Sequence, residues 1–113
     1  MSSRSPLLAL AFAASLLGCK SRPLPAEKAE YAGHWRGGGI DLVITQDGGV
    51  SYNRIKGAGH VEINGPIKGF DGDDFVVGVM VVKTTFDVTA PPHEAGGAWK
   101  MTVDGVELTR VAQ

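Results

Sequence analysis

The stretch that decides the fold class is Trp99-Lys-Met-Thr-Val-Asp-Gly-Val-Glu-Leu-Thr-Arg110, near the end of the chain. Apolar and polar residues alternate on both sides of Asp104-Gly105, from Trp99 to Val103 and from Val106 to Thr109. An Asp-Gly pair between two alternating runs is typical of a β-hairpin whose two turn residues both have positive φ. The sequence therefore predicts that the chain ends in an antiparallel hairpin with one buried face.

Upstream segments repeat this pattern and are separated by glycine-containing turns. The expected strands are 40–45, 50–55, 61–63, 67–70, 75–82, 84–88 and the two arms of the final hairpin. Both faces of Phe75–Val82 are apolar, so we expect this strand to be central or covered on both sides. The longest expected break is the loop at residues 89–98, which contains Pro91 and Pro92.

These segments predict an all-β fold, a small antiparallel meander of about seven or eight strands. Closing the meander into a barrel would hide its edges, and a barrel of this size is filled by side chains. The residues expected to fill the interior are Trp35, Leu42, Ile44, Tyr52, Phe75, Val77, Val79, Phe86, Trp99, Met101 and Leu108.

The N-terminal region has the features of an export signal. Residues 1–5 contain one cation and no acid, and Leu7–Leu17 is apolar apart from Ser15. The run is too short to span a bilayer. It closes on Leu16-Leu17-Gly18-Cys19, which contains the only cysteine of the chain. This motif resembles the lipobox of bacterial lipoproteins, which implies that Cys19 receives a diacylglycerol and becomes the first mature residue.

The predicted organisation is therefore a lipoprotein signal peptide at residues 1–18, an acylated cysteine with a flexible tether at 19–30, and a β-barrel domain at 31–113. Two prolines and mixed charge in the segment after Cys19 indicate an extended spacer, which would hold the domain about 30 Å or less from the bilayer. In many Gram-negative bacteria an aspartate directly after the acylated cysteine resembles an inner-membrane retention signal. This chain has Lys20 at that position. The expected location is the bacterial cell envelope, at the outer membrane.

The expected barrel also resembles known small barrels. Gly33-His34-Trp35, which opens the first strand, is similar to the Gly-x-Trp of lipocalin-type proteins, but no ligand site is carried over on that basis. The arrangement is also similar to lysozyme-inhibitor lipoproteins, which are small barrels on a lipid tether. Those proteins typically have a disulfide, and a chain with one cysteine cannot form one internally.

The net charge and the spacing of charged residues indicate which partners to expect. Without residues 1–18 the chain has ten Lys and Arg against twelve Asp and Glu, a net charge of −2 with no basic run. Nucleic-acid affinity depends on clustered cations, so a nucleic-acid partner is not expected. We expect membrane attachment to come from the acyl chains on Cys19.

No sequence motif indicates catalysis or a cofactor. His34, His60 and His93 lack metal-ligand spacing, and the acids around Gly72 lack the twelve-residue calcium series. Gly37-Gly38-Gly39 is followed by neither a phosphate-binding lysine nor a helix, so a strand break is expected there. With no nucleophile motif, the sequence favours a protein that is not an enzyme and needs neither metal nor cofactor.

Two functions from different classes follow from this. In the first, the domain is a non-catalytic binding module whose loop at 89–98, with His93 and Glu94, contacts an envelope protein. In the second, the barrel carries a small apolar ligand, as in lipocalins. An enclosed cavity would favour the carrier, and a packed interior would favour the interaction module.

Overall fold

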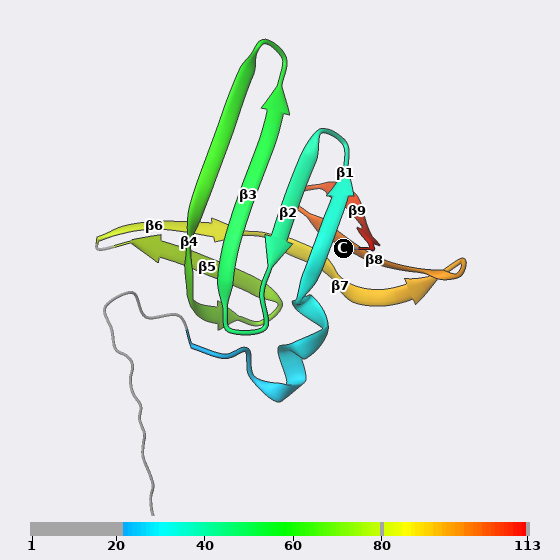
Figure 1. Ribbon diagram of the computed structural model, residues 1–113, viewed down its shortest axis with the longest axis horizontal. Helices are drawn as coiled ribbons and strands as arrows, with labels where there is room; N and C mark the ends of the chain where they lie inside the picture. The colour runs from blue at the N-terminus through cyan, green and yellow to red at the C-terminus, as the bar shows by residue number, and fades with distance from the viewer. Residues whose placement is uncertain (1–21, 80, 113) are drawn as a thin grey trace, which may run out of the picture.

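The computed structural model describes residues 22–79 and 81–112, which form a nine-stranded antiparallel meander (Figure 1). One short 3-10 helix, η2 (Ala26–Tyr31), precedes the sheet. The strands are β1 (Gly33–Gly37), β2 (Ile40–Ile44), β3 (Gly49–Lys56), β4 (Gly59–Asp71), β5 (Asp74–Val79), β6 (Val82–Phe86), β7 (Val88–Ala95), β8 (Ala98–Val103) and β9 (Val106–Val111). The predicted all-β antiparallel meander is confirmed, with nine strands in place of seven or eight.

The sheet curls into a half-barrel. Its strand order is β6-β5-β4-β3-β2-β1-β9-β8-β7, so the first and last strands of the meander pair with each other. The predicted closed barrel is not confirmed, because β6 and β7 are the two edges and no ladder joins them. Only Asp87 separates these strands, and a single residue cannot reverse the chain to bring them side by side.

The curl depends on β4, which is the longest strand. Residues 59–66 of β4 pair with β3, whereas residues 67–71 pair with β5 after a register shift between Ile67 and Gly69. Such irregularities bend a strand and let it pass from one sheet direction to another. As a result, β5 and β6 run across the direction of β1–β3 (Figure 1).

Two carboxylates hold the junction between β6 and β7. The backbone N–H of Val88 donates to Asp74 Oδ1 at 2.7 Å. The backbone N–H of Asp87 donates to Asp104 Oδ1 at 2.9 Å, and the N–H of Asp104 donates to the Asp87 carbonyl at 2.8 Å. These bonds satisfy backbone groups that no ladder partner reaches.

The final hairpin agrees with its prediction. Asp104 and Gly105 have φ values of 50° and 82°, the positive values that the Asp-Gly pattern requires. The ladder pairs Met101 with Leu108 and Val103 with Val106. Of these, Met101, Val103 and Leu108 are fully buried.

The expected central strand at Phe75–Val82 is wrong. β5 ends at Val79 and β6 begins at Val82, so the apolar run crosses a turn. Val81 and Val82 are 92% and 69% exposed. Apolar and β-branched residues therefore continue through this reversal without the glycine or proline that marks the other turns, and the pattern could not reveal it.

The expected loop at 89–98 is wrong as well, because most of it is strand β7, closed by the turn at Gly96-Gly97. Pro91 and Pro92 lie where the pairing of β7 with β8 shifts register, between Ala90 and His93. Proline lacks an N–H donor and is accepted in a sheet at edges and bulges, and β7 offers both.

The core occupies the concave side of the sheet. Of the predicted interior residues, nine are buried: Trp35, Leu42, Ile44, Tyr52, Phe75, Val77, Phe86, Met101 and Leu108. Trp99 is partly buried against this cluster, and the side chain of Val79 lies outside the described part. The core also contains Tyr31, Ile40, Val50, Ile67, Val88 and Val103.

Candidate functional site

The concave interior is packed by the protein's own side chains. The rings of Phe75 and Phe86 stack with centroids 4.9 Å apart, and Tyr52 lies 4.8 Å from Phe86. Trp35 has no exposed surface. The interior beneath these rings is occupied, so the surface clefts are the places where a ligand or partner can bind.

Residues 22–30 lie against the domain, whereas the sequence predicted a flexible tether at 19–30. The N–H of Leu24 donates to the Gln46 carbonyl at 2.9 Å, and the Leu24 side chain packs on the core. A side chain at Gly48 would collide with the backbone oxygen of Arg22. Proline content and mixed charge did not reveal that one leucine and a 3-10 turn fit the end of the sheet. Cys19 lies outside the described residues.

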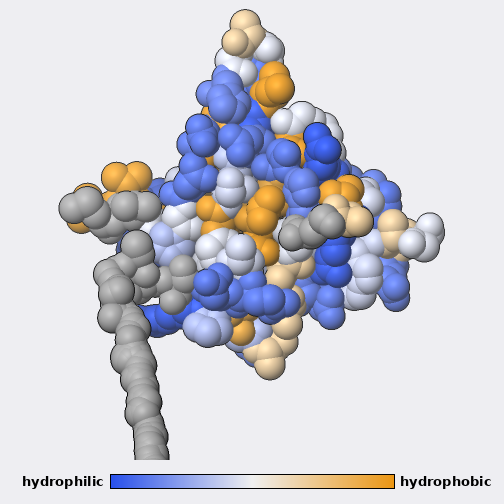
Figure 2. All heavy atoms as spheres, viewed as in Figure 1, coloured by the Kyte–Doolittle hydropathy of each residue, from blue (hydrophilic) through white to orange (hydrophobic). Residues whose placement is uncertain are grey.

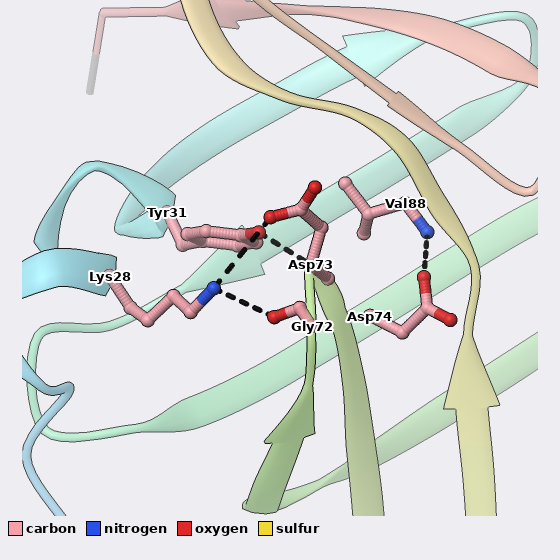
Figure 3. Close-up of polar contacts among 6 residues, drawn as sticks. All are labelled: Lys28, Tyr31, Gly72, Asp73, Asp74 and Val88. Atoms are coloured by element: carbon pink, nitrogen blue, oxygen red, sulfur yellow. Dashed lines mark hydrogen bonds and ion pairs between the residues drawn. The ribbon is translucent and has the colours of Figure 1, made fainter.

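Helix η2 closes this end of the sheet through Tyr31 and Lys28 (Figure 3). The Tyr31 hydroxyl donates to the Asp73 carbonyl at 2.8 Å, and Tyr31 is only 3% exposed. Burial, and then the negative charges of Asp73 and Asp74, raise the pKa of Tyr31 to about 12. The hydroxyl therefore stays protonated and remains a donor over the whole physiological range.

Lys28 links η2 to the turn between β4 and β5. Its Nζ donates to the Gly72 carbonyl at 2.8 Å and lies 3.8 Å from the Asp73 carboxylate. The same ammonium lies 5.1 Å from the ring centroid of Phe70, within the range of a cation–π contact. These contacts join the N-terminal segment to the β4–β5 turn.

Arg110 of β9 fixes the other side of η2. Its guanidinium carbon lies 4.8 Å from the Trp35 ring and 4.9 Å from the Trp99 ring. Its Nη2 donates to the Glu30 carbonyl and lies 3.4 Å from Glu30 Oε1. The first and last described parts of the chain are thus held together.

A first cleft, of about 240 Å³, opens between the N-terminal segment and β4. We call it the N-terminal cleft. Three cations line it, Arg22, Lys28 and Lys68, with Glu27 as the acid. Its apolar lining comprises Pro23, Leu24, Pro25, Ile67 and Phe70. The sequence has no run of basic residues here, because it is folding that brings Lys68 to cations some forty residues earlier.

A second cleft, of about 660 Å³, lies beside the turn Gly37–Gly39 and the hairpin of β3 and β4. We call it the hairpin cleft. Its polar lining comprises Arg36, Asp41, Asn53, Arg54 and His60. The Asp41 carboxylate has two partners, because it contacts the ring Nε2 of His34 and also lies 3.9 Å from Arg36 Nε. Ile40 and Ile55 complete the lining, so the cleft is mixed in polarity, with two arginines and one aspartate.

The projecting β3–β4 hairpin beside this cleft has a mixed surface. Ile55 is 66% exposed and Val61 is 39% exposed. Figure 2 shows apolar atoms among hydrophilic ones along the projecting hairpin. Such a surface offers both apolar contact and hydrogen bonds to a partner.

The predicted interaction residues lie elsewhere. His93 and Glu94 are both exposed on the edge strand β7, and neither lines the N-terminal or the hairpin cleft. His93 Nδ1 lies 2.8 Å from the Pro91 carbonyl, which orients the ring. The structure thus gives these two residues an edge-strand position in place of the expected loop.

The other sequence candidates are also placed. Gly37–Gly39 forms the β1–β2 turn, with φ values of 52° and 82° at Gly38 and Gly39. Asp71–Asp74 forms the β4–β5 turn that receives Tyr31 and Lys28. Within residues 22–79 and 81–112, no three His, Cys, Asp or Glu side chains group as metal ligands would.

In the part of the chain that the structure describes, no helix has the length and apolar character needed to cross a membrane. Comparisons with protein-family models, with curated proteins and with solved structures found no match.

Proposed function

We propose that this protein is a membrane-anchored envelope lipoprotein whose domain acts as a non-catalytic interaction module. Support for the anchor comes from Leu16-Leu17-Gly18-Cys19 at the end of an apolar export segment. Acylation also accounts for a lone cysteine in an exported chain, which would otherwise be a free thiol. The Lys20 that follows favours the outer membrane.

The observation that favours surface binding is the packed interior. A carrier of apolar molecules needs volume inside its barrel, and Trp35, Phe75 and Phe86 occupy that position here. The two clefts described above lie at the surface. Because the lipid confines the protein to a membrane, even weak surface contacts gain from a high effective concentration.

His93 and Glu94 remain the proposed contact residues for an envelope protein. Both side chains are exposed near the tip of the β7–β8 hairpin. Pro91 and Pro92 interrupt the free edge of β7, which disfavours addition of a partner strand there. Recognition at this site therefore depends on side chains more than on backbone pairing.

The anchor is tested by feeding cells an alkyne fatty acid and comparing the wild type with Cys19→Ala. The wild type should incorporate the label and lose residues 1–18, and the variant should remain an unlabelled precursor, because acyl transfer and cleavage both need the thiol. Equal labelling of the two proteins would refute the lipoprotein proposal.

The interaction module is tested by cross-linking in cells from a photoreactive residue placed at position 92, beside the two proposed contacts. A single envelope product should form, and the exchange His93→Glu with Glu94→His should weaken it without changing the melting temperature. The matched control is Lys56→Gln on the remote hairpin. Recovery of a stoichiometric small molecule from the purified protein would favour the carrier instead.

A further inference from the structure

We infer that the end of the domain bearing the N-terminal cleft lies directly against the bilayer, with the cleft binding the headgroup of an anionic phospholipid. The inference rests on the proposed acylation of Cys19. It adds to that proposal a second, non-covalent membrane contact and a fixed orientation of the domain.

The chain between the proposed anchor and this end of the domain is short. Arg22 is three residues after Cys19, and a fully extended chain spans at most about 3.3–3.6 Å per residue. The Cα of an acylated Cys19 can therefore be no more than about 11 Å from that of Arg22. Arg22 is placed by its contact with Gly48 and by the bond from Leu24 to Gln46. A tether that ends at residue 21 cannot hold this end of the domain far from the membrane.

The N-terminal cleft has more cations than acids in its lining. Arg22, Lys28 and Lys68 converge on the cleft, and Glu27 is the acidic residue in its lining. Lys28 is engaged by Gly72 and Asp73, whereas Arg22 and Lys68 have no ion pair among the described residues. A basic side chain at an anionic bilayer strengthens binding about fivefold, so two available cations beside the anchor favour phosphate-bearing lipids.

Apolar side chains form the walls of the N-terminal cleft. Leu24 and Phe70 are partly buried against the core, and both contribute to the cleft together with Pro23 and Pro25. A site with a basic rim and apolar walls matches the interfacial layer of a bilayer, where headgroup phosphates adjoin hydrocarbon. The hairpin cleft has two cations, Arg36 and Arg54, in place of three, and Asp41 lies 3.9 Å from Arg36 Nε.

This arrangement determines which end of the domain faces away from the membrane. Helix η2 and the β2–β3 turn lie at one end of the molecule, and the β3–β4 hairpin projects from the opposite end (Figure 1). With the N-terminal cleft on the membrane, the hairpin and its cleft point into the aqueous space.

The test uses the acylated protein in vesicles made of equal parts phosphatidylglycerol and phosphatidylcholine. Because acylation would occupy the only natural cysteine, one added cysteine can carry a fluorophore. Gln46→Cys labels the β2–β3 turn beside Leu24, and Ala58→Cys labels the hairpin tip as the matched control; both positions are exposed. A headgroup-attached quencher should quench the label at 46 severalfold more than the label at 58. Equal quenching would overturn the inference.

A charge series then identifies the lipid contact. Arg22→Gln and Lys68→Gln should each weaken the docked state about fivefold in the anionic vesicles, and Lys56→Gln, on the remote hairpin, should not. The effect should vanish in pure phosphatidylcholine and at high salt. If Lys56→Gln acts as strongly as Lys68→Gln, the contact is not at this cleft.

The two proposals fail in different ways. Intact mass shows whether the protein is acylated before any vesicle is added. Absence of the acyl mass contradicts the lipoprotein proposal, whereas an acylated protein whose label at 46 stays unquenched contradicts only the membrane-facing orientation.

Discussion

The two ends of the sheet are made of similar strands but are stabilised very differently. At the η2 end, Tyr31 is 3% exposed, and its ring lies 5.2 Å from Phe70 and 6.2 Å from Phe75. At the opposite end, the hairpin leaves Ile55 and Val61 exposed. We therefore expect the apolar cover over the concave face, more than strand pairing, to set the local stability of each end.

Register explains why the hairpin projects. The last pair between β2 and β3 is Ile40 with Arg54. Beyond it, the Ile55 N–H still donates to the Gly39 carbonyl, and the remaining residues pair only between β3 and β4. A two-stranded ribbon without a third strand or a covering element is marginally stable in water. We therefore expect the hairpin tip to open before the η2 end does.

The largest difference between the two ends should appear in the core beneath η2. Trp35 is fully buried, and its indole Nε1 donates to the Tyr31 carbonyl at 2.9 Å. Trp35→Ala should lower the free energy of unfolding by about 3–5 kcal/mol, because it leaves a cavity and an orphaned carbonyl. Urea unfolding followed by circular dichroism measures this, and a loss below about 1 kcal/mol would contradict the packing described.

The next largest effect should be a pH dependence of the free energy of unfolding, caused by Tyr31 at the η2 end. The pKa of Tyr31 is raised from 10.0 to about 12, so the unfolded chain loses this proton at lower pH than the folded protein does. The contribution of the Tyr31 hydroxyl to the free energy of unfolding is complete below pH 10. It falls as the pH rises, and about 2–3 kcal/mol of it is lost at pH 12. Urea unfolding across this range should show it.

The control is Tyr31→Phe, which keeps the ring but has no proton to lose. The wild type should be the more stable at pH 9, and its advantage should shrink steadily as the pH rises. A difference between the two proteins that does not change with pH would show that Tyr31 ionises at its ordinary pKa.

Turn glycines give a smaller and sharper comparison. Gly105 and Gly57 both have positive φ, 82° and 58°, and an added Cβ at either meets nothing within 4 Å. Gly105→Ala should cost about 1–2 kcal/mol because of the left-handed backbone. Gly57→Ala should cost less than half as much, since the projecting hairpin can relieve the strain by local opening. Equal losses in melting experiments would mean that the hairpin is as firmly held as the final turn.

The smallest effect is expected at the hairpin surface. Ile55 is 66% exposed, so Ile55→Ser should change the free energy of unfolding by no more than about 0.5 kcal/mol. The same unfolding measurement applies. A loss of more than about 1 kcal/mol would show that Ile55 is covered in solution, for example by a second molecule.

Local patterns predicted the elements whose turns carry glycine or Asp-Gly, including the hairpin around Asp104 and the inward residues of β2 and β3. They failed where the turn had no such signal, as between Val79 and Val82, and where Pro91 and Pro92 indicated a loop. A proline on an edge strand and a proline in a loop look alike until the strand order is known.

The candidate functional residues also differ in how far the sequence alone could predict them. The motif at Cys19 is contiguous, so the sequence alone predicts an anchor. The N-terminal cleft could not be predicted, because its cations come from the N-terminal segment and from β4.

The sequence by itself determined the antiparallel meander, since alternation with period two and left-handed turn residues act between near neighbours. Only the tertiary structure decided that the sheet stays open between β6 and β7, that residues 22–30 dock on it, and that Arg22, Lys28 and Lys68 share one cleft. Those outcomes depend on the bend in β4 and on side chains that meet across long chain separations, and no local pattern encodes such distances.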